Sequence, residues 1–197
     1  MSLSERKTIV VDIDGVIVDL ETHFLSEFNK INGWTPERIS DEYYFGCRYD
    51  IREQEAMDIL HMMDWSNAPV YQDAVDAMRI LKDAGFHIVL CTAVDERHIP
   101  ARIKNMEQHG ICFDEIISSG FHGNKEEVTR AYNPMAIVDD LYKHLNEFDD
   151  VKRKYLVDRG YTNQEPWNCA GHISVVSGIL SAAQSIIDME ENATLSM

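Results

Sequence analysis

Apolar and polar positions along the chain follow two alternating patterns. Short, largely β-branched or apolar runs that are typical of buried strands occur at residues 8–11, 86–92, 115–118, 135–138 and 154–157. Segments of helical character lie between or after them, at residues 20–32, 74–84, 96–109 and 173–188. Strands that alternate with helices predict a mostly parallel sheet covered by helices on both faces, which is a three-layer α/β fold.

Residues 33–68 depart from this pattern. They are rich in aromatic and charged side chains, lack β-branched strand patterns, and contain one helical stretch at residues 51–63. We therefore expect residues 21–68 to form a small helical cap, inserted after the first strand into a core made of residues 1–20 and 69–197. A small hydrophobic core within the cap would explain most of its aromatic residues, and one or two of them would face a ligand.

Charge and composition narrow the classes of partner. The 197 residues include 34 acidic and 18 basic side chains, for a formal net charge of −16, and such a surface repels nucleic-acid polymers and anionic membranes. The four cysteines are widely spaced, without a Cys-x-x-Cys pair, which suits a reducing compartment. Neither a signal peptide nor a membrane-length apolar run is recognisable. We expect a soluble cytoplasmic protein; a small phosphorylated ligand and a homodimer are both compatible with these features.

Two carboxylates, Asp12 and Asp14, directly follow the first strand in the sequence Asp-Ile-Asp-Gly. Side chains alternate along a strand, so both point the same way, and open α/β sheets bind ligands at the carboxyl ends of their strands. Two such carboxylates repel each other unless a cation lies between them or one is protonated. The alternative is that they cap the following turn and helix, as Asp often does.

Further polar residues are expected at the same edge of the sheet, namely Thr92, Lys125 and the pair Asp139-Asp140. Taken singly, Thr92 is more typical of a helix N-cap and Lys125 of a solvent-exposed loop. The acidic pair is more informative, because two carboxylates that end a buried strand need a cation or a cap. The four stretches together, in this order, are hard to explain by coincidence.

In this order the stretches resemble the four motifs of the haloacid dehalogenase (HAD) superfamily of phosphohydrolases, and the resemblance extends over residues 7–188. It implies that Asp12 is the nucleophile, which forms an aspartyl-phosphate, and that Asp14 is the general acid and base. It also implies that Thr92 and Lys125 bind the phosphoryl oxygens and offset their charge.

The same resemblance implies a Mg²⁺ cofactor, which suits a site of oxygen ligands. The ligands would be Asp12, the backbone carbonyl of Asp14 and one carboxylate of the acidic pair. We expect Asp140 to contact the metal directly and Asp139 to lie behind it.

Within the superfamily, residues 12–29 resemble the start of the 5'(3')-deoxyribonucleotidases, and residues 124–128 and 156–163 fit the same family. The resemblance implies a nucleoside monophosphate as the substrate. Two departures stand out. Ala93-Val94 replaces the Ser-Pro that follows the second-motif threonine in that family, and Gly160 replaces a proline.

Substrate choice would then be made in the cap. The candidate substrate-binding residues there are Trp34, Tyr44, Phe45 and Arg48. The aromatic side chains could stack on a base, and the arginine could instead read a second anionic group.

Other functions stay open. A HAD phosphatase or phosphomutase that acts on another small metabolite would keep both aspartates. A dehalogenase is disfavoured, because its reaction has no leaving alkoxide that needs the acid Asp14. A phosphate-accepting receiver domain would place its acidic pair before the acceptor, whereas here the pair comes last. A non-catalytic phosphate- or nucleotide-binding HAD protein is disfavoured because every expected catalytic position is present.

Overall fold

A single parallel sheet forms the centre of the molecule. The computed structural model describes residues 7–162 and 172–195. The sheet has the strand order β3-β2-β1-β4-β5-β6. Its strands are β1 (Thr8–Val11), β2 (His87–Thr92), β3 (Glu115–Ser118), β4 (Ala136–Asp139), β5 (Arg153–Val157) and β6 (Ile173–Val176). Because β1 is central and the chain adds later strands first on one side and then on the other, the carboxyl end of β1 lies at a topological switch point.

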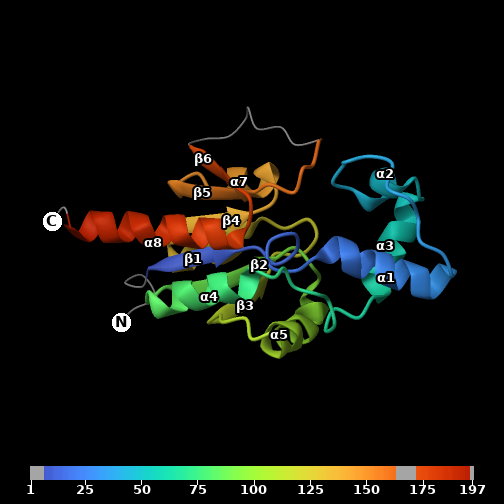
Figure 1. Ribbon diagram of the computed structural model, residues 1–197, viewed down its shortest axis with the longest axis horizontal. Coiled ribbons are helices and arrows are strands. Elements are labelled where there is room, and N and C mark those ends of the chain that lie inside the picture. The colour runs from blue at the N-terminus through green and yellow to red at the C-terminus, as the bar shows by residue number, and fades with distance from the viewer. Residues whose placement is uncertain (1–6, 163–171, 196–197) are drawn as a thin grey trace.

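Two helical layers cover the sheet (Figure 1). Helices α4 (Ala74–Asp83), α5 (Ile99–Gln108) and α8 (Ile179–Leu195) pack on one face, and α6 (Lys125–Thr129) and α7 (Tyr142–Glu147) on the other. Alternation along β1 sends Ile9 and Val11 into the first of these cores and Val10 into the second. The predicted three-layer α/β fold is therefore confirmed.

Three helices, α1 (Leu20–Asn32), α2 (Phe45–Tyr49) and α3 (Glu53–Met62), lie together beyond the carboxyl ends of the strands (Figure 1). Asp19 caps α1 by accepting a hydrogen bond from the Thr22 backbone N–H at 3.0 Å, and Gly33 ends the helix with a φ of +76°. The three helices share a small core of Phe24, Phe28, Tyr49, Ala56 and Ile59.

One predicted helix is wrong in its first part. Ile173–Val176 forms β6, which pairs in parallel with β5, and α8 begins only at Ile179. The reason is local, because Ile173, Val175 and Val176 are β-branched and favour an extended strand. The helical segment predicted at residues 96–109 begins as a 3₁₀ turn, η2 (Glu96–His98), which leads directly into α5. The sequence did not predict the short helices α2, α6 and α7 or the 3₁₀ turn η3 (Arg130–Tyr132).

No helix in residues 7–162 or 172–195 combines the length and the apolar character needed to cross a bilayer.

Candidate active site

The turn after β1 brings Asp12 and Asp14 to the switch point. The Asp12 backbone N–H still donates to the carbonyl of Val138 on β4, at 2.9 Å, so the side chain leaves from the last paired position of the strand. Gly15 follows with a φ of +79°, and a Cβ atom there would lie 1.9 Å from Oδ2 of Asp140. Only glycine, which has no Cβ atom, lets this turn approach Asp140 at the end of β4 so closely.

Three buried carboxylates meet at this point. Asp12, Asp139 and Asp140 each place one carboxylate oxygen within 4.8 Å of the others. All three side chains are almost fully buried. Oxygen atoms alone, gathered in this way, form a donor set that suits Mg²⁺.

Lys125 supplies a buried positive charge to the cluster. Its Nζ lies 2.8 Å from Oδ1 of Asp12 and 2.6 Å from Oδ2 of Asp139. The residue begins α6, where the Asn124 side chain accepts from the Glu127 backbone N–H at 3.0 Å. The structure thus places Lys125 among the acidic residues and not in a solvent-exposed loop.

The electrostatics distinguish the three carboxylates. Burial raises the pKa of Asp12 to about 7, although Lys125 opposes the shift. Burial, together with the charges of Asp12 and Asp139, raises the pKa of Asp140 well above its usual range. At Asp139 burial is outweighed by Lys125 and His144, which hold its pKa below its usual range.

The surroundings of the three carboxylates favour a divalent cation beside Asp12 and Asp140 over one beside Asp139. Asp139 accepts hydrogen bonds from the Leu141 backbone N–H at 2.9 Å and from His144 at 3.2 Å, in addition to Lys125. Asp12 and Asp140 are the two whose charged forms are disfavoured, first by burial and then by neighbouring carboxylates, and a cation beside them would offset both effects. These two carboxylates could hold a metal, with Asp139 behind them.

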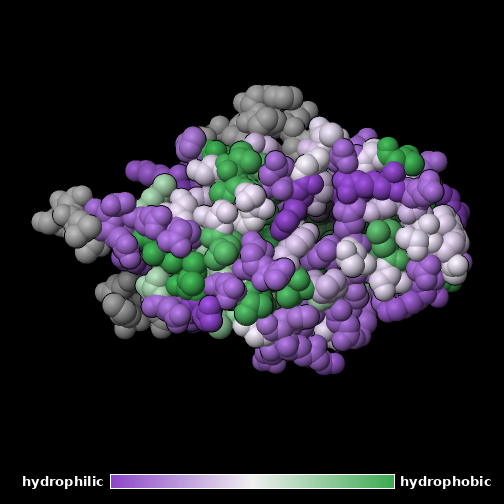
Figure 2. All heavy atoms as spheres, viewed as in Figure 1, coloured by the Kyte–Doolittle hydropathy of each residue, from purple (hydrophilic) through white to green (hydrophobic). Residues whose placement is uncertain are grey.

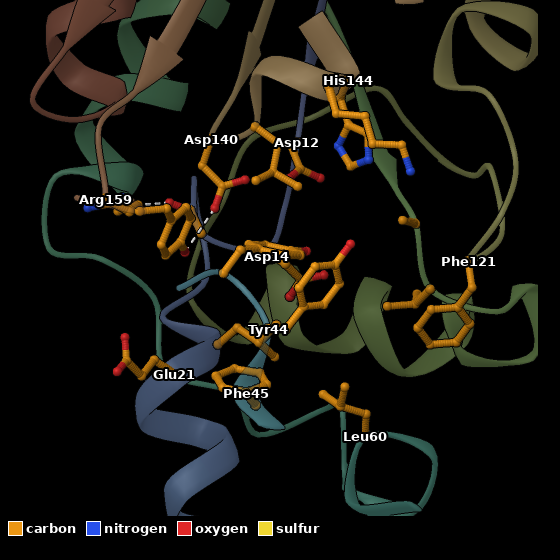
Figure 3. Close-up of a pocket in the computed structure, with 18 of the residues that line it drawn as sticks. Asp12, Asp14, Glu21, Tyr44, Phe45, Leu60, Phe121, Asp140, His144 and Arg159 are labelled. Atoms are coloured by element: carbon orange, nitrogen blue, oxygen red, sulfur yellow. Dashed lines mark hydrogen bonds between the residues drawn. The ribbon is translucent and has the colours of Figure 1, made fainter. Parts of the chain in front are cut away.

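Asp14 is held from both sides (Figure 3 shows it facing the cavity). Thr92, at the end of β2, lies 3.2 Å from Oδ2 of Asp14 and donates its hydroxyl hydrogen. Arg102 on α5 donates to Oδ1. Thr92 is fully buried and its hydroxyl faces Asp14.

Sequence reasoning missed Arg102. The only signal was its position: Arg102, Asn105 and Met106 share one buried face of α5, where an arginine and an asparagine interrupt an apolar stripe.

A cavity of about 900 Å³ opens between the core and the helices α1–α3. Figure 2 shows it as a hollow among mostly hydrophilic side chains. Asp12, Asp14 and Asp140 lie at its inner end, and Tyr44 and Phe45 line the wall that faces them (Figure 3). The acidic residues and an aromatic wall thus line the same cavity.

Trp34 does not reach this cavity. Its ring packs edge-on against Phe28 at a centroid distance of 5.1 Å, just beyond the end of α1, and it does not contribute to the lining. Because this aromatic side chain is used to cover the small core of the cap, the structure does not support the expectation that Trp34 binds substrate.

Arg48 lines the cavity but is almost completely buried. It donates to the carbonyls of Glu42 and Tyr43 at 2.7 and 3.0 Å, and its Nη1 lies 2.8 Å from Oε2 of Glu21. Each guanidinium nitrogen already has a partner within the cap. These bonds fix α2 to α1, so the structure does not favour Arg48 as a reader of a second anionic group.

The loop after β5 contacts both the turn after β1 and the acidic cluster. Arg159 donates from Nε to the carbonyl of Gly15, and its guanidinium lies 3.6 Å from the ring centre of Tyr71. The Tyr161 hydroxyl lies 3.1 Å from Oδ2 of Asp140 and donates to it. Arg159 and Tyr161 therefore support the turn after β1 and the acidic cluster, while Asn163 of the same predicted stretch lies outside the described residues.

No protein-family model and no curated protein sequence matches the chain. Solved structures match it over nearly its whole length, at low identity. A protein of Thermotoga maritima assigned as a β-phosphoglucomutase is 12% identical, with a TM-score of 0.64, covering 92% of this chain and 99% of that one.

Two further structures resemble it to a similar degree. A HAD family hydrolase from Deinococcus radiodurans R1, with bound phosphate and sodium, is 12% identical, with a TM-score of 0.59, covering 94% and 97% of the two chains. An L-2-haloacid dehalogenase from Xanthobacter autotrophicus, with covalently bound chloropropionic acid, is 11% identical, with a TM-score of 0.60, covering 92% and 98%. These neighbours perform different reactions on one scaffold, so they identify the architecture and not the substrate. The chain has the α/β fold of the haloacid dehalogenase-like hydrolases.

Proposed function

We propose that the chain is a HAD-type phosphomonoesterase that acts on a nucleoside monophosphate, as a 5'-nucleotidase of the deoxyribonucleotidase type. The observation that carries the proposal is the convergence of Asp12, Asp14, Lys125 and Asp140 in the lining of one cavity, with Asp139 beside them in the same acidic cluster. The sequence alone predicts each of these residues at this edge of the sheet. The positive charge of Lys125 among buried acids reduces the repulsion between an attacking carboxylate and an anionic substrate.

The side chains then divide the reaction between them. Asp12 attacks phosphorus and forms an aspartyl-phosphate, while Asp14 gives a proton to the leaving alkoxide. Asp14 next takes a proton from the water that attacks phosphorus, which releases phosphate and restores Asp12. Lys125 offsets charge at the phosphoryl oxygens and orients the nucleophile through its ion pair with it.

Mg²⁺, bound by Asp12 and Asp140 with the backbone carbonyl of Asp14, would neutralise the phosphoryl charge that repels the attacking carboxylate.

Metal binding is testable without turnover. Mg²⁺ at about 100 times its Kd should raise the melting temperature by about 5–10 °C, because it binds the folded state alone and relieves carboxylate repulsion. Asp140→Asn should abolish this rise, whereas Asp149→Asn, an exposed acid, should retain it. An unchanged rise in Asp140→Asn would remove that carboxylate from the metal site.

The cavity supports a bulky leaving group. A volume of about 900 Å³ is larger than a two- or three-carbon phosphate requires, and its outer wall is aromatic and apolar. The rings of Phe45 and Phe24 stack with their centroids 4.0 Å apart, so one face of the Phe45 ring is covered. Tyr44 is 53% exposed and lines the cavity, which makes its ring the better platform for a base.

Tyr44→Ala should therefore lower kcat/KM for nucleoside monophosphates by about 10-fold, the cost of losing one base–aromatic stack. Its effect on a small aliphatic phosphate should stay within about 2-fold, because that substrate does not reach the wall. Trp34→Ala is the matched control, since Trp34 is 52% exposed on the same cap but does not line the cavity. Steady-state phosphate release over both substrate classes measures the difference. Equal effects on the two classes, or faster hydrolysis of sugar phosphates by the unaltered protein, would transfer the assignment to another phosphometabolite.

A further inference from the structure

Arg102 is a buried cation with an unusual environment. Its side chain is fully buried on α5, and Nη2 donates to Oδ1 of Asp14. Within the described part of the chain, Nε and Nη1 have no hydrogen-bond partner. The guanidinium lies 4.1 Å from the ring centre of Trp65, a position that gives a cation–π contact.

Such a group is expensive to keep in a core. Burial of a guanidinium costs several kcal/mol unless a counter-ion and hydrogen bonds compensate for it. Here one carboxylate and one aromatic face provide the compensation, and two N–H-bearing nitrogens receive none. Buried groups that are left unsatisfied in this way point to a function other than stability.

Arg102 and Thr92 together fix the plane of the Asp14 carboxylate. The threonine hydroxyl binds Oδ2 and the arginine binds Oδ1, so each oxygen has its own donor on a regular element of the core. Removal of either donor leaves the carboxylate free to turn about its last torsion. Proton transfer is sensitive to such a change, because donor and acceptor must lie at hydrogen-bond distance.

The other side of Arg102 contacts the connection between cap and core. Trp65 belongs to the segment that leads from α3 back into the core, and it lines the cavity. From the same helix as Arg102, Asn105 donates to the carbonyls of Ser66 and Ala68 at 3.3 and 2.8 Å. Helix α5 therefore holds this connection while it holds Asp14.

We propose that Arg102 is a positioning residue that orients the Asp14 carboxylate for proton transfer and ties that orientation, through Trp65, to the cap–core connection. This inference rests on the proposed phosphomonoesterase function. It assigns a role to a residue that would act on the reaction only through the Asp14 side chain.

The test uses the dependence on the leaving group. The parameter kcat/KM reports on the steps up to departure of the leaving group. An alkoxide leaves from an alkyl phosphate only with a proton from a well-placed acid, whereas 4-nitrophenolate leaves from 4-nitrophenyl phosphate without one. Arg102→Met should lower kcat/KM about 100-fold for a nucleoside 5'-monophosphate and by less than about 5-fold for the aryl ester. In a protein that already carries Asp14→Asn, adding Arg102→Met should lower kcat/KM by less than about 2-fold, because the carboxylate that Arg102 orients is already absent.

Arg102→Lys keeps the charge and should recover part of the loss on the alkyl ester. Equal losses on the two esters, or full additivity with Asp14→Asn, would assign Arg102 to packing and overturn the inference. Failure of both Arg102 variants to fold, seen by circular dichroism, would overturn it in the same way. If the unaltered protein releases phosphate from neither ester, the proposed function itself fails, which is a different result.

Discussion

Asp12→Asn is expected to lower phosphate release by at least about 10⁴-fold, the scale of loss when a covalent nucleophile is removed. An amide cannot attack phosphorus, and Asp139 is not available to replace Asp12, because it is bonded to Lys125, His144 and the backbone of Leu141. Steady-state phosphate release with Mg²⁺ present measures the effect. Asp149→Asn, an exposed acid outside the cavity, should retain full activity.

The same variant should remain folded. Burial raises the pKa of Asp12 from 3.8 to about 7, so the folded state holds this proton more tightly than the unfolded state does. The stabilisation that Asp12 provides is therefore complete below about pH 4 and is lost as the pH rises towards 7. In metal-free protein at pH 8, Asp12→Asn should melt no lower than the unaltered chain, because its amide carries no charge. Turnover within 10-fold of the unaltered protein would rule out the aspartyl-phosphate mechanism.

Lys125→Met has the second large effect, and it acts on stability as well as on turnover. It leaves Asp12 and Asp139 buried without the ammonium that lies 2.8 and 2.6 Å from them. Removal of one partner of a buried ion pair costs about 3–5 kcal/mol, and we expect a loss of this size in metal-free protein at neutral pH. Phosphate release should become undetectable, because the phosphoryl group loses the buried ammonium that lies beside the nucleophile Asp12.

Denaturant unfolding at two pH values separates this cause from simple packing. The stability lost in Lys125→Met should be smaller at pH 5 than at pH 8, because protonation of Asp12 and Asp139 removes the repulsion between them. Lys104→Met, an exposed lysine on α5, should change stability by less than about 0.5 kcal/mol. A Lys125→Met protein as stable as that control would show that the buried ion pairs do not hold the cluster together.

The sequence predicted the parts of the site that lie at strand ends. Asp12, Lys125 and the pair Asp139-Asp140 meet because parallel strands bring their carboxyl ends to one edge, a rule that needs only the order of strands. The α/β architecture followed from the same alternation of apolar patterns. The place of Asp139 behind Asp140 was expected only from the resemblance to the HAD superfamily. Its physical cause could not be predicted, because it depends on donors from Lys125, Leu141 and His144, which lie in or beside two short helices, α6 and α7, that were not expected.

Residues that act through tertiary contacts were out of reach. Arg102 lies ten positions after Thr92 and reaches Asp14 only because α5 packs against the turn after β1. Trp34 and Tyr44 are both exposed cap aromatics, and only the packing of α1 against Trp34 separates them. Local patterns describe elements, whereas these choices depend on how elements pack.

The most direct test of the central claim compares hydrolysis of a phosphate ester with hydrolysis of a carbon–chlorine bond. The protein would be incubated with and without Mg²⁺, in parallel, with a panel of nucleoside and sugar phosphates and with 2-chloropropionic acid. Released phosphate and released chloride would both be measured. We predict Mg²⁺-dependent phosphate release, fastest from deoxynucleoside monophosphates, and no chloride. Chloride release without phosphate release would contradict the assignment and make the chain a dehalogenase.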